Sequence, residues 1–219
     1  MPIAIPSDEA AIRAAISAPR ASTYLSATGG DSQKAVELYG WNARISSALM
    51  LPAHFAEVTT RNAASDALTS VYGSRWPWDR TFEQSLPTAH GPVYKPRADL
   101  VRTRNSQPST GKVIAELKFV FWQKMFTARH DTRLWNAQIL TLFPNATGLT
   151  PHQLRQRVFD DLEVIRRLRN RIAHHEPIIT RNLVDDLNRM LDLVDLRSSG
   201  TGVWVRAMED VTAVLAERP

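Results

Sequence analysis

Apolar residues recur three and four positions apart along most of the chain, which is the spacing of amphipathic α-helices. The alternation that strands need is nowhere sustained, so the pattern predicts an all-α protein. The longest helical region is expected to start at a cap formed by Asp31 or Ser32 and to run to about Tyr72. Gly40 and Pro52 are expected to divide it into two or three helices, because proline lacks the backbone donor and clashes with the preceding turn.

Shorter helices are expected on both sides of this region. Ser7 can cap a first helix that Pro19 ends. The other apolar patterns predict helices over 111–126, 129–143, 182–197 and 203–216, the last two separated by the glycine-containing segment 198–202. The aromatic residues of 111–126 surround their helix, so they are expected in the hydrophobic core and not on a base-stacking face.

The segment 73–110 is expected to be an irregular, proline-rich insertion, because closely spaced prolines argue against long elements. A basic stretch over 94–104 lies within it. This stretch is either a solvated loop or an arm that follows a phosphate backbone, for which such cations are the usual equipment. The cations of that stretch that would contact phosphate are Lys95, Arg97, Arg102 and Arg104.

A central amphipathic helix is predicted to start at Thr150, which can cap it ahead of a proline in the first turn. It is expected to end at His174 and His175, because the residue before Pro177 is pushed out of the α region. Arginines crowd the segment 166–171 of this helix, next to histidines that can exchange protons near neutral pH. A helix with only a structural role has little need of that combination.

The composition agrees with a globular protein that meets a polyanion. Apolar residues make up 43% and charged residues 22% of the chain, both ordinary values. The formal net charge of +5 suits a nucleic-acid partner. There is no cysteine, which excludes disulfides, thiolate nucleophiles and cysteine zinc sites.

The sequence contains no membrane span, because no run of about eighteen apolar residues occurs. Its first residues lack the basic start and long apolar stretch of a secretory signal. The absence of cysteine fits a reducing cytoplasm, although it is also compatible with export. We therefore expect a cytoplasmic protein.

His174 is the strongest candidate for catalysis, because imidazole takes and gives protons near pH 7. In RNA cleavage it could deprotonate a 2′-hydroxyl or protonate the leaving 5′-oxygen. Arg169 could hold the scissile phosphate and stabilise charge on its oxygens, and Asn170 could orient the imidazole or the phosphate. Arg166 shares a helix stripe with Asn170 and His174, and with Arg171 it is a further candidate for binding phosphate. Such a mechanism needs no metal and yields a 2′,3′-cyclic phosphate.

The spacing of Arg169 and His174 sets a geometric constraint, because residues five apart lie about 140° apart around an ideal helix. Either the helix ends or distorts between them, or two copies of the segment meet and build one pocket. A purely structural alternative is that these cations complement the dipole at the helix C-terminus. Adjacent histidines splay apart and no HExxH spacing accompanies them, so no metal site and no cofactor are predicted.

Five blocks of the sequence, taken in order, resemble the Abi-like (abortive infection, AbiD/AbiF-type) branch of the HEPN-domain ribonucleases. Arg169, Asn170 and His174 match the Arg-x4-His signature of that group. The resemblance covers about residues 15–180, and its blocks are 19–25, 35–42, 57–63, 115–122 and 168–178. The last block is the most specific, and it matches almost throughout.

The resemblance implies a HEPN-like helical bundle with additional helices. It implies one domain, with N-terminal helices over 1–30, a HEPN-related core over 31–180 and C-terminal helices over 181–219. It also implies a homodimer whose pocket is shared between copies, and a metal-independent endoribonuclease that acts in phage defence. An antitoxin or a regulatory RNA is a further partner that it suggests.

Supporting roles follow for several neighbours of the central helix. Glu57 and Arg61 can pair on one helix face, or Arg61 and Asn62 can be buried against the central helix, where they position Arg169 or line an RNA groove. His175 is expected to be structural, and it replaces His174 if the helix register differs. In the block 19–25, Arg20 is expected to be mainly structural.

One departure from the family pattern bears on regulation. HEPN toxins paired with nucleotidyltransferase antitoxins often carry a tyrosine shortly after the histidine, and this chain has none there. Control by modification of that tyrosine is therefore not expected. Two other functions remain open from the sequence: a non-catalytic module of the same fold that holds a structured noncoding RNA, and an all-α protein-interaction domain.

Overall fold

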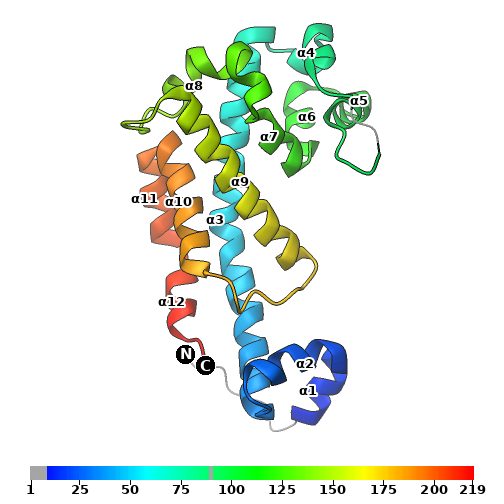
Figure 1. Ribbon diagram of the computed structural model, residues 1–219, viewed down its shortest axis with the longest axis vertical. Coiled ribbons are helices and arrows are strands. Elements are labelled where there is room, and N and C mark those ends of the chain that lie inside the picture. Colours follow the sequence, from blue (N-terminus) through cyan, green and yellow to red (C-terminus); the bar gives the residue numbers. More distant parts are fainter. Residues whose placement is uncertain (1–8, 89–90) are drawn as a thin grey trace.

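The computed structural model describes residues 9–88 and 91–219. Ser7, the expected cap of the first helix, lies outside the described residues. The described chain contains helices, turns and loops but no strand, which confirms the all-α prediction. A long helix, α3 (Ser32–Tyr72), runs along the molecule, and the other elements pack around it (Figure 1).

The remaining elements follow in chain order. Before α3 come α1 (Glu9–Ile16) and α2 (Ala18–Ala27). After it come η1 (Trp76–Trp78), α4 (Arg80–Ser85), α5 (Pro96–Ser106), α6 (Thr110–Glu116), α7 (Phe119–Met125), η2 (Ala128–His130), η3 (Asp131–Trp135) and α8 (Asn136–Leu142). The chain ends with α9 (Pro151–Ala173), α10 (Leu183–Arg197), α11 (Ser199–Met208) and α12 (Val211–Ala216).

Helix α3 is not divided at Gly40 or Pro52, so that prediction is wrong. Its 41 residues form one helix, capped by the Asp31 side chain, which accepts the Lys34 amide at 3.0 Å. Proline inside a helix costs about 3 kcal/mol. Fully burying a large apolar side chain such as Leu49 returns about 1.5–3 kcal/mol, and α3 buries such side chains before and after the proline. Tertiary packing therefore overrides the local signal.

The segment 73–110 is more regular than predicted, because η1, α4 and α5 lie within it. Its prolines sit where helices tolerate them. Pro77 lies inside the short turn η1, and Pro96 opens α5, where the missing amide would have no helical partner. The basic stretch 94–104 thus belongs mostly to a helix and does not form an extended arm.

Other boundaries also differ from the prediction. The helix expected over 111–126 is two helices, because Leu117 is extended and buried between α6 and α7. The last predicted helix, 203–216, is also two, and the first of them begins earlier, at a cap from Ser198. The segment 129–143 combines short turns with α8. The predicted starts at Thr150 and Asn182 are confirmed by side-chain caps.

One hydrophobic cluster runs from Tyr24 to Val214 around α3. Four tryptophans are its largest members and are at most 2% exposed: Trp41, Trp76, Trp122 and Trp135. Most of the aromatic side chains of α7 lie inside this cluster, as the pattern around that helix predicts. They are therefore core residues.

The central helix α9 lies antiparallel to α3, and the chain that follows it is fixed to α3 by a buried hydrogen bond. The Ile178 amide donates to Oδ1 of Asn42 at 2.9 Å. Both residues are buried, at 0% and 7% exposure. This contact holds the end of α9, and with it the predicted catalytic segment, in place.

Replacing Asn42 with alanine should lower the free energy of unfolding by about 1–3 kcal/mol, because the buried Ile178 amide would lose its only acceptor among the described residues. Chemical denaturation of the two proteins measures this difference. Ser47→Ala, an exposed polar change on the same helix, is the matched control and should leave stability within about 0.5 kcal/mol. Equal stability of both variants would contradict the prediction.

Candidate functional site

The C-terminus of α9 closes in a Schellman motif that fixes the register of the histidines. The His175 amide donates to the Ile172 carbonyl at 2.9 Å, and the Glu176 amide donates to the Arg171 carbonyl at 2.8 Å. His174 is the C-cap, and His175 occupies the left-handed position at φ 54°, where glycine is usual. His175 therefore has a backbone role at the turn, and the side chains of both His174 and His175 are exposed.

His174 lines a surface pocket of about 310 Å³ between the end of α9 and the start of α2. The Arg20 guanidinium lines the same pocket, and its Nη1 donates to the His175 carbonyl at 2.7 Å. Within the described part of the chain, no residue hydrogen-bonds the His174 ring. The pocket residues are Ser17, Pro19, Arg20, Thr23, His174, His175, Glu176 and Pro177. An uncommitted imidazole and a guanidinium thus share one open site.

Arg20 is a residue whose role the sequence did not reveal. Its block, 19–25, was part of the family resemblance, and that was the only signal. Because Arg20 lies more than 150 positions before His174, only the fold could bring the two together.

Arg169 lies elsewhere, on the side of α9 that faces α3 and α7. Its Nη1 lies 2.8 Å from Oε2 of Glu57, and its guanidinium stands 5.3 Å from the ring centroid of Phe119. Arg169 is not among the residues lining the pocket of His174. The helix stays regular through Ala173, so the separation of about 140° between the two residues persists. A single chain therefore does not bring the predicted catalytic pair together.

Glu57 pairs with Arg169 and not with Arg61, so the predicted pair within α3 is absent. Arg61 has no carboxylate partner among the described residues, and its Nε is buried without an acceptor. Asn62 is exposed, which contradicts the expectation that it is buried against the central helix. Asn170 is exposed as well. Arg61 is thus a guanidinium that remains available to an anion.

Arg166 is held by Glu163 and is not free as an auxiliary phosphate ligand. It donates from Nε at 3.1 Å and from Nη2 to both carboxylate oxygens at 2.9 and 3.0 Å, and Arg167 donates to the same carboxylate at 2.7 Å. Partial burial of Glu163 opposes its ionisation, but hydrogen bonds from Arg166, Arg167 and Gln123 outweigh burial and lower its pKa to about 2. This cluster joins α9 to α7 through Gln123.

Arg171 is used within its own loop. It donates to the Pro177 carbonyl at 2.7 Å and lies 3.5 Å from Glu176. These contacts bridge the Schellman turn, so Arg171 supports the position of the histidines. The geometry gives it a structural task that the sequence did not indicate.

The basic stretch before α6 is bound mainly to its own surroundings. Lys95 is exposed. The three arginines are engaged within the chain: Arg97 with the carbonyls of Gln84 and Leu86, Arg102 with Asp99, and Arg104 with the Pro77 carbonyl and Glu83. These contacts fasten α5 to α4 and η1, and they leave little free charge for a phosphate-following arm.

No protein-family model, curated protein or solved structure matches this chain. In the described residues, no group of three or more His, Asp or Glu side chains is arranged to hold a metal ion. None of the helices in residues 9–88 and 91–219 is long and apolar enough to cross a membrane.

Glu163→Gln should lower the free energy of unfolding by about 1–3 kcal/mol at pH 7, because the ionised carboxylate accepts the Arg166, Arg167 and Gln123 donors. The pKa of Glu163 is about 2 in the fold against an ordinary 4.5, so this contribution is complete above pH 4.5 and is lost as pH falls toward 2. Urea denaturation at pH 7 and pH 3.5 measures it. Glu116→Gln, at an exposed position, is the control. If the stability lost in Glu163→Gln were as large at pH 3.5 as at pH 7, this account would be contradicted.

His175→Gly should raise the free energy of unfolding by about 0.5 kcal/mol, because relief of left-handed strain exceeds the entropy that glycine adds to the unfolded chain. His174→Gly is the matched comparison and should lower it by a similar amount, since His174 has an ordinary φ of −92°. Thermal denaturation of both variants shows whether each change raises or lowers the free energy of unfolding. Destabilisation by His175→Gly would mean that its side chain, and not its backbone, holds the turn.

Proposed function

We propose that this chain is a metal-independent endoribonuclease, similar to the Abi-like HEPN proteins, that cleaves RNA to 2′,3′-cyclic phosphate ends. The observation that carries the proposal is the exposed His174 imidazole, which has no hydrogen-bond partner among the described residues and shares its pocket with Arg20. Acid–base chemistry needs a titratable ring that substrate can reach, and phosphate recognition needs a guanidinium beside it.

In this reaction His174 carries out one of the two proton transfers. The 2′-oxygen attacks phosphorus, the bond from phosphorus to the 5′-oxygen breaks, one proton leaves the 2′-hydroxyl and another reaches the 5′-oxygen. His174 either accepts the first proton or donates the second. Water or a second imidazole supplies the other transfer.

Two arginines serve the phosphate in this proposal. Arg20 reaches it from the same chain, using guanidinium donors that remain after its bond to the His175 carbonyl. Arg169 reaches it from a second copy, because it does not line the His174 pocket of its own chain and its side chain, beside Glu57 and Phe119, stays 31% exposed. Glu57 then acts as a positioning residue that orients the Arg169 guanidinium. The net charge of +5 favours approach of the polyanion.

The biological setting follows from the family resemblance alone. In it, a cytoplasmic homodimer cuts host or phage RNA after infection and is held inactive until then. An antitoxin or a regulatory RNA is the proposed restraint. If the chain instead holds a noncoding RNA without cutting it, His174 would not be needed for that RNA's retention.

Purified protein with labelled single-stranded RNA in EDTA should produce fragments ending in 2′,3′-cyclic phosphate. His174→Ala, Arg169→Ala and Arg20→Ala should each lower the rate by about 10²-fold or more, as expected for an acid–base or phosphate-stabilising group. Arg167→Ala removes an exposed arginine of the same helix and should change the rate less than about threefold. RNA binding without cleavage by the wild type would support the non-catalytic alternative.

Mixing the inactive variants tests whether the site is shared between copies. A dimer formed from one Arg169→Ala chain and one His174→Ala chain contains one intact site if each site draws on both chains. After equal mixing and exchange, activity should return to about a quarter of the wild-type value. Mixing Arg20→Ala with His174→Ala should restore nothing, because these two residues belong to one chain. If mixing Arg169→Ala with His174→Ala restored nothing while mixing Arg20→Ala with His174→Ala restored activity, the shared site would be refuted.

A further inference from the structure

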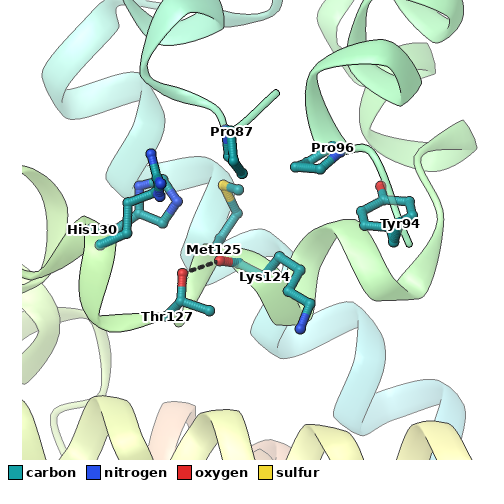
Figure 2. A pocket seen from close by; sticks show the side chains of 8 residues that line it. Pro87, Tyr94, Pro96, Lys124, Met125, Thr127 and His130 are labelled. Carbon is teal, nitrogen blue, oxygen red and sulfur yellow. Dashed lines mark hydrogen bonds between the residues drawn. The ribbon is translucent and has the colours of Figure 1, made fainter. Parts of the chain in front are cut away.

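A second pocket lies away from His174, among the end of α7, the turn η2 and the residues flanking the start of α5. Its volume is about 250 Å³. Figure 2 shows Met125 at its centre, His130 on one side, and Pro96 with Tyr94 on the other. The complete lining is Pro87, Tyr94, Pro96, Lys124, Met125, Thr127, Arg129 and His130. None of the residues assigned to RNA cleavage belongs to it.

The body of the pocket is apolar and already formed. Met125 is 1% exposed, and its thioether points between Pro87 and Pro96 (Figure 2). The Tyr94 ring forms a wall, and its hydroxyl is occupied by a hydrogen bond to Oδ2 of Asp99 at 2.7 Å. A flexible thioether between rigid pyrrolidine rings suits a flat ligand ring.

His130 is a mostly buried residue at one side of this pocket. The residue is 3% exposed, and no hydrogen bond to its ring is formed by the described residues. Burial, followed by the charges of Arg129 and Arg133, lowers its pKa to about 4. The ring is therefore neutral at pH 7 and carries one N–H to donate. The ring nitrogens are not among the fully buried side-chain atoms that lack a partner in the described residues, so the ring N–H is a donor open to an acceptor in the pocket.

The charged residues that line the pocket are cationic. Arg129 and Lys124 line it, and none of its lining residues is acidic. Arg129 is exposed and uses Nη1 on the Ser85 carbonyl at 3.2 Å, which leaves other guanidinium donors. Lys124 places its ammonium 5.4 Å from the Phe159 ring centroid, outside any ion pair among the described residues. An anion is thus the complement of these cations.

We propose that this pocket binds a small organic anion with a flat apolar ring and one carboxylate. The ring lies against Met125, Pro96 and Tyr94. The carboxylate accepts hydrogen bonds from Arg129 and from the ring N–H of His130. The volume limits the ligand to about one fused bicyclic ring. The apolar walls on both sides distinguish this pocket from a site that binds phosphate alone.

Methyl-labelled methionine provides a direct test, because Met125 is at the centre of the pocket. The full-length protein carrying ¹³C-methyl methionine would be titrated with indole-3-carboxylate, the neutral indole-3-carboxamide and inorganic phosphate. Met125→Leu assigns the signal. We expect a saturable shift of the Met125 methyl with the carboxylate, an affinity for the carboxamide lower by about tenfold or more, and no response to phosphate.

Two arginine variants separate a direct contact from net charge. Arg129→Gln should lower the affinity for indole-3-carboxylate by about tenfold. Arg133→Gln removes an exposed arginine that does not line the pocket, and it should lower this affinity by less than about threefold. Both positions are exposed, so both variants should fold, which circular dichroism checks. The proposal is overturned if the Met125 methyl does not respond to the carboxylate, responds equally to the carboxamide, or shifts with phosphate. Equal weakening by the two variants also overturns it.

Discussion

The burial of one continuous helix along nearly its whole length is the constraint on which this structure depends. Helix α3 packs against helices from both ends of the chain, including α2, α9, α10 and α12 (Figure 1). Small residues make this possible. Five alanines of α3 are at most 1% exposed: Ala53, Ala56, Ala63, Ala64 and Ala67. Without bulky side chains at these positions, neighbouring helices approach the backbone closely, and dispersion contacts add up over the length of the helix.

The same constraint separates the two predicted catalytic residues. Helix α9 is held against α3 at two levels, by Arg169 on Glu57 and by the Ile178 amide on Asn42. These contacts hold Arg169 beside α3, with 31% of its side chain exposed, and carry His174 past the end of the helix, toward α2. A site containing both residues then requires a second copy of the chain. The pairing of Arg169 with Glu57 thus connects helix packing to the proposed dimer.

The two pockets differ in the physics that would select their ligands. The pocket of His174 is open and polar, and its geometry depends on a strained backbone position at His175. Strain of this kind persists where surrounding contacts determine the conformation, here the Schellman turn and the Arg20 bond to the His175 carbonyl. The pocket of Met125 is mostly apolar, and Lys124 and Arg129 are its charged lining residues. The first suits a solvated phosphate, and the second suits a desolvated ring.

The sequence by itself determined the features that depend on neighbouring residues. These are the helical class, the helix starts at Asp31 or Ser32, Thr150 and Asn182, and the end of α9 at His174 and His175. Caps and helix ends are local because their hydrogen bonds join residues three to five positions apart. Only the tertiary structure decided the continuity of α3 through Pro52 and the partners of the arginines. A local propensity of a few kcal/mol is outweighed by the burial of apolar side chains. Ion pairs such as Arg169–Glu57 join residues more than a hundred positions apart, so local patterns do not reveal them.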